Sequence, residues 1–202
     1  MRVGVFGGTF DPPHVGHLIL AEEARCQLHL DRLLWVLTPD PPHKYGRIIR
    51  PWQTRLELVE AAIMDNPVFE LSRVDLDRPA PYYAAITLEL LAKAIPGAEL
   101  FYIMGGDSLR DLPIWYEPQH LLAQVAGLGV LRRPRDRVDL AALEAYLPGI
   151  TPKIQFVQAP LLDISSSDIR MRIASGRSFR YYLPSAVYEL IQRHGLYQKN
   201  PA

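Results

Sequence analysis

The chain has 202 residues, 49% of them hydrophobic and 22% charged, and its 22 basic residues balance 22 acidic ones. This length and composition are typical of one soluble globular domain, which we expect to span residues 1–202. The net charge of zero argues against a basic nucleic-acid groove, and no apolar run is long enough to span a membrane. Without a signal-peptide pattern, we expect a cytoplasmic protein with no nucleic-acid or membrane partner.

Six segments are predicted to be strands, and several are nearly continuous apolar runs, as expected for parallel strands covered on both faces. They lie at 2–7, 32–39, 68–72, 99–105, 126–133 and 153–158. Helical patterns fall near 17–29, 52–65, 82–95, 119–124, 139–147, 167–175 and 184–194. This alternation predicts an α/β fold with a doubly wound, Rossmann-like, mostly parallel sheet flanked by helices. A small C-terminal helical part carries the sequence ISSSDIR.

Cys26 is the single cysteine, so an intramolecular disulfide is excluded. Its place within an apolar helical pattern predicts a core position rather than a reactive thiol.

Unusual residues gather where the predicted strands end. The first strand ends in two glycines, the second in TPDPPHK, the fourth in MGGDS and the fifth in LRRP. Ligands of open parallel sheets bind beyond the carboxyl ends of the strands. We therefore expect these four strand ends to share one cleft.

The stretch GGTFDPPHVGH, residues 7–17, joins the first strand to the first helix. Its glycines allow backbone N–H groups to approach a phosphate, Thr9 adds a hydroxyl donor, and the following helix points its positive end at the same place. The simpler interpretation is a tight turn that the prolines stiffen. The stretch has neither the ending of a P-loop nor the spacing of a dinucleotide fingerprint.

His14 and His17 are three residues apart at the helix entry, so their rings can face one site. Gly16 between them leaves room for a ligand against the backbone. Two imidazoles beside a phosphate stabilise added negative charge. The alternatives are surface or capping histidines, and a zinc site that lacks further ligands at metal spacing.

The segment ISSSDIR, residues 164–170, follows the last predicted strand. Its serines are typical N-cap residues and Asp168 lies in the first helical turn, so a well-capped helix is the simplest interpretation. Arg170 beside a helix N-terminus with hydroxyls also forms a second anion site. Two anion sites without a nucleophile between them indicate phosphoryl-group transfer, in which the protein acts by holding the reacting groups in place.

These residues resemble two motifs of the nucleotidyltransferase superfamily. The motif G-x-[FY]-x-P-x-H-x-G-H falls here on Gly8, Phe10, Pro12, His14, Gly16 and His17, and ISSSDIR is similar to I-S-S-T-x-[IL]-R. Further segments in order resemble the bacterial nicotinate-nucleotide adenylyltransferase family, and GLYQ near the C-terminus fits its usual ending. They are TPDPPHK at 38–44, RPAPYYAAITL at 78–88, IMGGDSL at 103–109, IWYE at 114–117 and LRRP at 131–134.

The resemblance implies an enzyme of NAD biosynthesis that makes nicotinic acid adenine dinucleotide and pyrophosphate from ATP and nicotinate mononucleotide. Mg²⁺ is then held mainly by the ATP phosphates, without an assigned protein ligand. His14 and His17 are the implied catalytic residues. The implied ATP-binding residues are Gly8, Thr9, Phe10, Gly16, Gly105, Asp107, Ile164, Ser165, Ser166 and Arg170. Those implied for nicotinate mononucleotide are Lys44, Thr87, Trp115, which stacks on the pyridine ring, and Arg133.

One departure from the family pattern concerns the acceptor. Many members read SYT where this chain has Tyr82, Tyr83 and Ala84, so a hydroxyl near the nicotinate carboxylate is missing. Backbone N–H groups or Thr87 are the remaining donors, and nicotinamide mononucleotide stays open as an acceptor.

Simpler roles also remain for several of these residues. Trp115 fits a core or rim aromatic, Asp107 a helix cap, Arg133 a solvated charge, and Tyr82 and Tyr83 helix-face residues.

Other functions and properties remain as alternatives. They are a pantetheine-phosphate adenylyltransferase, a cytidylyltransferase, a fragment of a class I aminoacyl-tRNA synthetase and a nucleotide sensor without turnover. A homo-oligomer is left open. The segments 39–50 and 105–117, rich in proline and glycine, are candidate lid loops.

Overall fold

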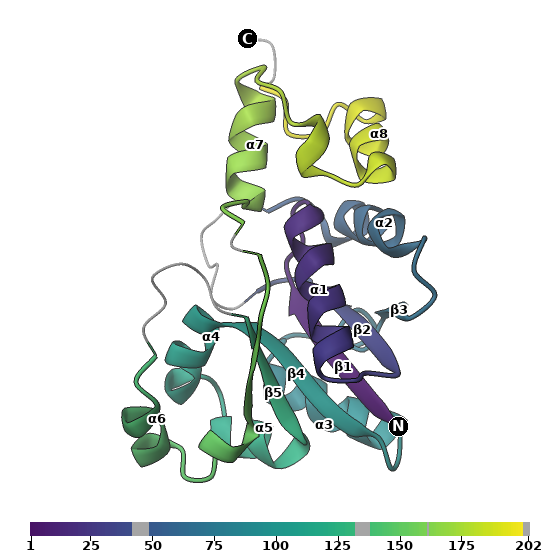
Figure 1. Ribbon diagram of the computed structural model, residues 1–202. Helices are drawn as coiled ribbons and strands as arrows, with labels where there is room; N and C mark the ends of the chain where they lie inside the picture. The colour runs from purple at the N-terminus through teal and green to yellow at the C-terminus, as the bar shows by residue number, and fades with distance from the viewer. Residues whose placement is uncertain (42–48, 132–137, 161, 200–202) are drawn as a thin grey trace.

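A computed structural model describes residues 1–41, 49–131, 138–160 and 162–199 of the chain. These residues form a six-stranded sheet with the order β3-β2-β1-β4-β5-β6, and every neighbouring pair is parallel (Figure 1). The strands are β1 (Arg2–Gly8), β2 (Arg32–Leu37), β3 (Phe69–Ser72), β4 (Glu99–Gly105), β5 (Gly127–Leu131) and β6 (Ile154–Val157). The strand order reverses between β1 and β4, which confirms the doubly wound fold and marks its switch point.

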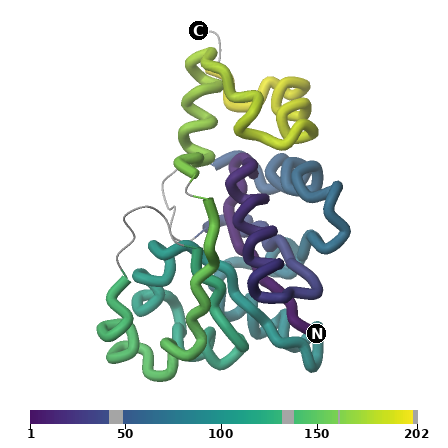
Figure 2. The backbone as a smooth tube through the Cα atoms, in the orientation of Figure 1, coloured from purple at the N-terminus to yellow at the C-terminus, as the bar shows by residue number. Residues whose placement is uncertain are grey.

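Helices cover both faces of this sheet in the described part of the chain. They are α1 (Val15–Gln27), α2 (Trp52–Ile63), α3 (Ala84–Ala94), α4 (Gly106–Asp111), α5 (Pro118–Gln124), α6 (Leu140–Tyr146), α7 (Ser166–Ala174) and α8 (Ser185–Arg193). Short 3₁₀ turns lie at Leu112–Ile114, Thr151–Lys153 and Arg180–Tyr182. The C-terminal helices α7 and α8 lie beyond the end of the sheet, with α8 beside α2 (Figure 2).

The alternation of side chains along the strands explains their continuous apolar sequences. On β2, Leu34 and Val36 pack into one core cluster, together with residues of α3, α5 and α6. Trp35 and Leu37 point the other way, into a cluster shared with α1, α2, α7 and α8. Both faces of the sheet are therefore buried, and this packing holds the strand ends in place.

The helix α4 was not expected from the sequence, which suggested a loop over 105–117. The glycines of MGGDS obscure it, but Leu109 and the following Leu112 are fully buried and hold this segment against the core. Helix α3 begins at Ala84, so Tyr82 and Tyr83 precede it rather than lying on its face. Most of the other candidate lid, 39–50, lies outside the described residues.

Cys26 is exposed, so the expected core position was wrong. The buried positions of α1 are Gly16, Ala21 and Ala24, and a residue two positions after Ala24 turns to the opposite side of a helix.

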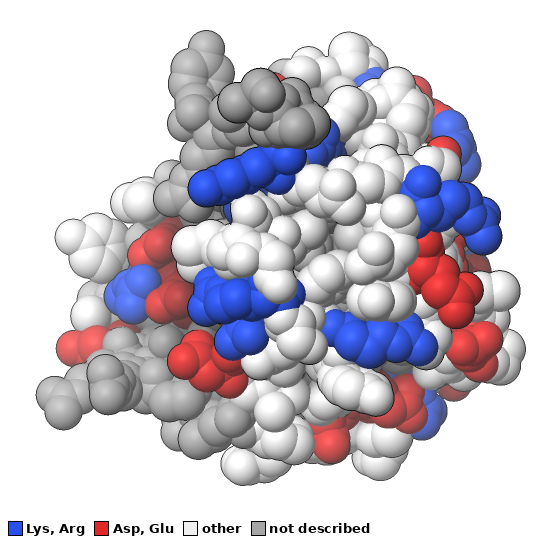
Figure 3. All heavy atoms as spheres, turned by 90° about the horizontal axis from the view of Figure 1, so that it is seen from above, with Lys and Arg blue, Asp and Glu red and all other residues white. Residues whose placement is uncertain are grey.

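The surface seen from above carries basic side chains scattered among uncharged ones, and acidic side chains lie beside several of them (Figure 3). This pattern agrees with the balanced composition of the chain. Among the helices of the described ranges, none has the length and apolar character needed to cross a membrane.

Candidate active site

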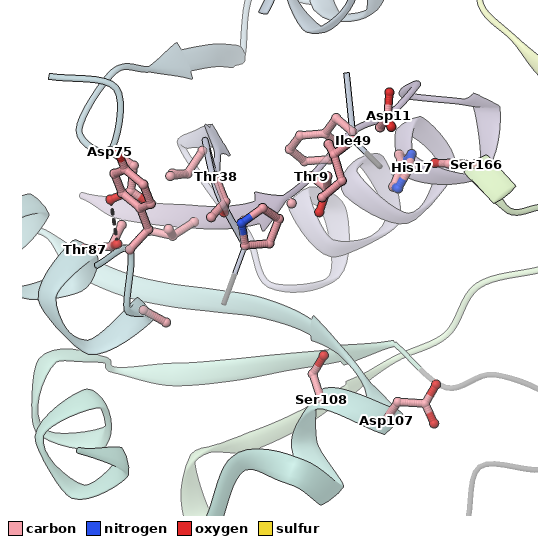
Figure 4. A pocket seen from close by; sticks show the side chains of 18 of the residues that line it. Thr9, Asp11, His17, Thr38, Ile49, Asp75, Thr87, Asp107, Ser108 and Ser166 are labelled. Carbon is pink, nitrogen blue, oxygen red and sulfur yellow. Dashed lines mark hydrogen bonds between the residues drawn. The ribbon is translucent and has the colours of Figure 1, made fainter. Parts of the chain in front are cut away.

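A cavity of about 900 Å³ opens where the strands β1, β2 and β4 end, at the switch point of the sheet. Its volume lies within the range of small-molecule sites. Five separate parts of the chain line it, within residues 5–17, 36–49, 75–87, 102–116 and 164–170 (Figure 4). The predicted site residues among its lining are Gly8, Thr9, Phe10, His14, His17, Thr87, Asp107, Trp115, Ile164, Ser165, Ser166 and Arg170. Lys44 and Arg133 lie outside the described residues.

The loop after β1 is anchored to the core by an aromatic ring. Phe10 is 2% exposed and packs edge-on against Phe6 and His17, with ring centroids 5.6 and 5.2 Å apart. A Cβ at Gly8 would lie 2.6 Å from the Phe10 ring, so the position next to that ring requires glycine. The Phe10 side chain therefore fixes the loop from the core, and the backbone of the loop faces the cavity.

His14 and His17 stand together at the start of α1. Their rings stack with centroids 3.7 Å apart and planes inclined by 25°. His14 is the N-cap residue, and its backbone N–H donates to Nδ1 of His17 over 3.2 Å. Since Nδ1 of His17 accepts this bond, the neutral ring carries its proton on Nε2.

Gly16 has a packing role that the sequence did not reveal. A Cβ at this position would lie 3.0 Å from Nδ1 of His14, tighter than ordinary van der Waals contact. The residue is buried in α1 beneath the His14 ring. Its glycine therefore makes room for a protein side chain, whereas the sequence suggested room for a ligand.

The C-terminal motif lies directly against the first one. Ser166 donates through its hydroxyl to the carbonyl of Pro12, 154 residues earlier, over 2.8 Å. Arg170 donates to the carbonyl of Asp11 over 2.7 Å. Ser165 is the N-cap of α7 and accepts from the backbone N–H of Asp168, as the sequence predicted. Two helix N-termini, those of α1 and α7, thus meet at one end of the cavity (Figure 4).

Asp107 lies on the cavity wall formed by α4, and Gly105 is the last residue of the neighbouring strand β4. Asp107 is exposed in the first turn of α4 and pairs with Arg110 over 3.1 Å. Gly105 is the N-cap of this helix, and a Cβ built there meets nothing within 4 Å among the described residues. Packing within the described protein therefore does not require glycine at this position.

The other end of the cavity is aromatic. Trp115 is half-buried and meets Tyr102 edge-on, with ring centroids 6.3 Å apart. Tyr83 and Tyr116 stack beside them at 4.3 Å. Trp115 also packs against the core cluster on this side of the sheet, so its rim position fits the simpler interpretation as well. Burial raises the pKa of Tyr102, which therefore stays a neutral hydroxyl.

A buried polar group below this end was missed by the sequence analysis. Asp75 is 3% exposed and accepts from the Thr87 hydroxyl over 2.8 Å (Figure 4). It also accepts from Nε of Arg78 over 2.9 Å. Burial raises the pKa of Asp75, while Thr87 and Arg78 act in the opposite direction. The segment VDLDRPA contains two aspartates, Asp75 and Asp77, two residues apart, and the sequence does not tell which one is buried. Thr87 thus directs its hydroxyl to a protein carboxylate.

We expect Thr87→Val to destabilise the protein by about 1–3 kcal/mol at pH 7, because it removes a donor from the buried carboxylate of Asp75. The donor favours the ionised form, so its removal raises the pKa of Asp75 further. The stability difference from wild type should therefore grow from pH 3 to pH 7. Urea unfolding over this range measures it.

The matched control is Thr151→Val. The hydroxyl of Thr151 donates to Glu144 at the surface, so the loss of stability should be smaller. A loss for Thr87→Val that is independent of pH would contradict the assigned charge of Asp75.

A parallel doubly wound sheet with two helix N-termini and paired histidines at its switch point is the arrangement of a nucleotidyltransferase. Residues 5–172 match the family described as cytidylyltransferase-like, and the chain belongs to this family. Within it, the chain belongs with the nicotinate-nucleotide adenylyltransferases, because its curated relatives carry that name at high identity over nearly their whole length.

Three such relatives are named probable nicotinate-nucleotide adenylyltransferase. The protein of Thermomicrobium roseum is 47% identical, and the matched region covers 98% of this chain and 92% of the relative. That of a Roseiflexus species is 44% identical, covering 97% and 98%. That of Thermus thermophilus is 41% identical, covering 98% and 100%.

A solved structure supports the fold. The nicotinic acid mononucleotide adenylyltransferase of Plasmodium falciparum, complexed with NaAD, superposes with a TM-score of 0.78 over 97% of both chains. At 17% sequence identity, this likeness concerns the fold.

Proposed function

We propose that the protein transfers the adenylyl group of ATP to nicotinate mononucleotide, giving nicotinic acid adenine dinucleotide and pyrophosphate for NAD synthesis. The observation that carries the proposal is the meeting of α1 and α7 at one end of a cavity whose other end is aromatic. One end suits a triphosphate, because two helix N-termini supply N–H groups and positive partial charge. The other end suits a flat pyridine ring.

The reaction requires in-line displacement at the α-phosphate. An oxygen of the acceptor phosphate forms a new bond to the α-phosphorus, and the bond between that phosphorus and the α,β-bridging oxygen breaks. Pyrophosphate leaves with the electron pair. The attacking oxygen is already an anion, so the site has to position two anions and offset the growing charge rather than remove a proton.

We assign this charge stabilisation to His14 and His17. The Nδ1 atom of His17 accepts from the backbone of His14, which leaves an Nε2–H donor on the other side of the ring. The stacked rings keep the pair in one orientation. A fixed donor stabilises developing charge without reorganising during the reaction. The β- and γ-phosphates then lie toward Arg170 and the first turn of α7.

Mg²⁺ is proposed to arrive with the phosphates of ATP. Asp107 gives the cavity wall an exposed carboxylate, a ligand type that suits this ion. In the described ranges, no group of three or more His, Cys, Asp or Glu side chains is arranged to hold a metal. This fits an ion that keeps several waters and takes most of its ligands from substrate phosphates. Bound there, it would offset the charge of the triphosphate.

The nicotinate carboxylate is proposed to bind at the N-terminus of α3. Thr87 is an unsuitable ligand because its hydroxyl already donates to Asp75. The first backbone hydrogen bond of α3 runs from the N–H of Thr87 to the carbonyl of Tyr83. The N–H groups that precede Thr87 in the first turn therefore have no acceptor within the helix. Ala84 lines the cavity beside them. Backbone donors can therefore replace the hydroxyl that Ala84 lacks.

The test is pyrophosphate release with ATP and Mg²⁺, comparing nicotinate mononucleotide with nicotinamide mononucleotide. A strong preference for the acid is expected. Equal use of both acceptors would leave the reaction intact and overturn the assigned carboxylate site. Activity with phosphopantetheine alone, or ATP binding without any turnover, would overturn the proposed substrate or the proposed reaction.

Trp115→Ala should raise KM for nicotinate mononucleotide about tenfold and leave KM for ATP nearly unchanged, because stacking on an indole contributes about 1 kcal/mol or more. Initial rates at varied substrate concentrations measure both constants. Trp115→Phe keeps a ring and should recover part of the affinity. A loss confined to ATP would show that the pyridine ring lies elsewhere.

A further inference from the structure

The carboxylate of Asp11 is a buried charge within the loop that follows β1. The residue is 4% exposed, and its carboxylate accepts from the Tyr197 hydroxyl over 2.7 Å and from the backbone N–H of Arg50 over 3.4 Å. The function proposed above gives this carboxylate no role. A buried carboxylate needs such donors, because an ionised group without them is strongly destabilised.

Tyr197 comes from the far end of the chain, 186 residues from its partner. It follows α8 and adopts a positive φ of 65°, an uncommon backbone conformation for a side chain of this size. Its ring is 6% exposed in the core cluster, and the guanidinium of Arg50 lies over it at 5.3 Å. Burial raises the pKa of Tyr197, so the hydroxyl keeps its proton and donates a hydrogen bond to Asp11 throughout the physiological pH range.

Arg170 lies close to this pair. Its guanidinium donates to the backbone carbonyl of Asp11 over 2.7 Å, but the nearest carboxylate oxygen is 3.9 Å away. This separation exceeds that of a hydrogen-bonded ion pair. The side chain of Arg170 is 34% exposed and lines the cavity. Tyr197 thus holds a negative charge beside Arg170 without a direct bond between the carboxylate and the guanidinium.

We propose that Asp11 and Tyr197 are positioning residues for the triphosphate of ATP. The Asp11 carbonyl aims the guanidinium of Arg170 at the cavity, and the Tyr197 hydroxyl holds the Asp11 carboxylate away from it. Without that hydroxyl the carboxylate turns toward Arg170 and competes with the phosphates for its charge. The C-terminal segment thereby sets how strongly Arg170 attracts the phosphates of ATP. This inference rests on the proposed function for the identity of the nucleotide.

The experiment measures the dissociation constant of ATP with Mg²⁺ by calorimetry, together with pyrophosphate release and thermal unfolding. Tyr197→Phe removes one hydroxyl and keeps the buried ring. We expect ATP binding to weaken about tenfold, with KM for nicotinate mononucleotide unchanged. Tyr188→Phe is the matched control, because Tyr188 belongs to α8 and packs on Phe179 and Arg180 rather than on Asp11. It should bind ATP as wild type does.

A double-mutant cycle separates this role from a purely structural one. Asp11→Asn keeps an acceptor for Tyr197 but carries no charge that attracts Arg170. Tyr197→Phe should therefore weaken ATP binding much less in the Asp11→Asn background than in wild type. An equal loss in both backgrounds, or unchanged ATP binding in Tyr197→Phe, would overturn the proposal.

The two proposals fail in different ways. Wild-type protein that binds ATP but does not turn over nicotinate mononucleotide would contradict the proposed function, and the cycle would still decide the role of Tyr197. Wild-type protein that does not bind ATP would overturn both.

Discussion

His17→Ala should lower turnover by about a hundredfold or more while the protein stays folded. The replacement removes the Nε2–H donor that we assign to the charge developing at the α-phosphate, and loss of one such donor typically costs this much. Initial rates of pyrophosphate release measure it, with circular dichroism as the check on folding. His194→Ala, an exposed histidine after α8, is the control and should keep wild-type activity.

A second variant separates the chemical role of His17 from its role at the helix start. His17→Asn places an amide oxygen near the position of Nδ1, where it can accept from the backbone N–H of His14. It lacks the Nε2–H group. We therefore expect Asn to recover any stability lost in His17→Ala, by about 1 kcal/mol, but not the turnover. Near-normal turnover in either variant would remove His17 from the mechanism.

Arg55→Met should lower the free energy of unfolding by about 3–5 kcal/mol. Arg55 is 1% exposed, although it carries a charge. Its guanidinium donates to four backbone carbonyls, those of Thr9, Thr38, Pro39 and Arg50. These carbonyls belong to the segments after β1 and β2 and before α2. Methionine fills similar space but leaves all four acceptors without this partner.

Burial lowers the pKa of Arg55, whereas the nearby charge of Asp11 raises it. Urea unfolding at pH 7 measures the loss of stability. Arg73→Met is the matched control, because Arg73 is exposed and pairs with Asp77 on the surface, where a change of about 0.5 kcal/mol is expected. A loss below about 1 kcal/mol in Arg55→Met would mean that water replaces the guanidinium at the loop carbonyls.

The burial of Arg55 shows what periodicity can and cannot reveal. It shares one face of α2 with Leu58, Val59 and Ala62, all buried, at helical spacing. An arginine at this position interrupts the apolar pattern, so the sequence analysis did not identify Arg55 as buried. Its partners did not follow from the sequence, because they are carbonyls of loops that three different segments bring together.

The two motifs of the site likewise combine features that the local sequence predicts with contacts that it does not. Local chemistry predicted the N-cap role of Ser165, and the three-residue spacing predicted that His14 and His17 face one site. The contact of Ser166 with Pro12 depends on packing of α7 against the β1 loop across 154 residues. Thr87 was assigned to the acceptor from its place in a segment, but its hydroxyl bonds to Asp75, which comes from another loop.

The sequence by itself determined the six strands, the helices other than α4 and the capping residues of the two motifs. These depend on apolar periodicity, glycine and capping residues, which act over a few neighbouring positions. Tertiary structure decided that Asp75, Arg55 and Asp11 are buried and which groups they bind, and it made α4 a helix rather than a loop. Burial of a polar group requires partners from distant segments, and its free energy depends on their distances, which local patterns do not encode.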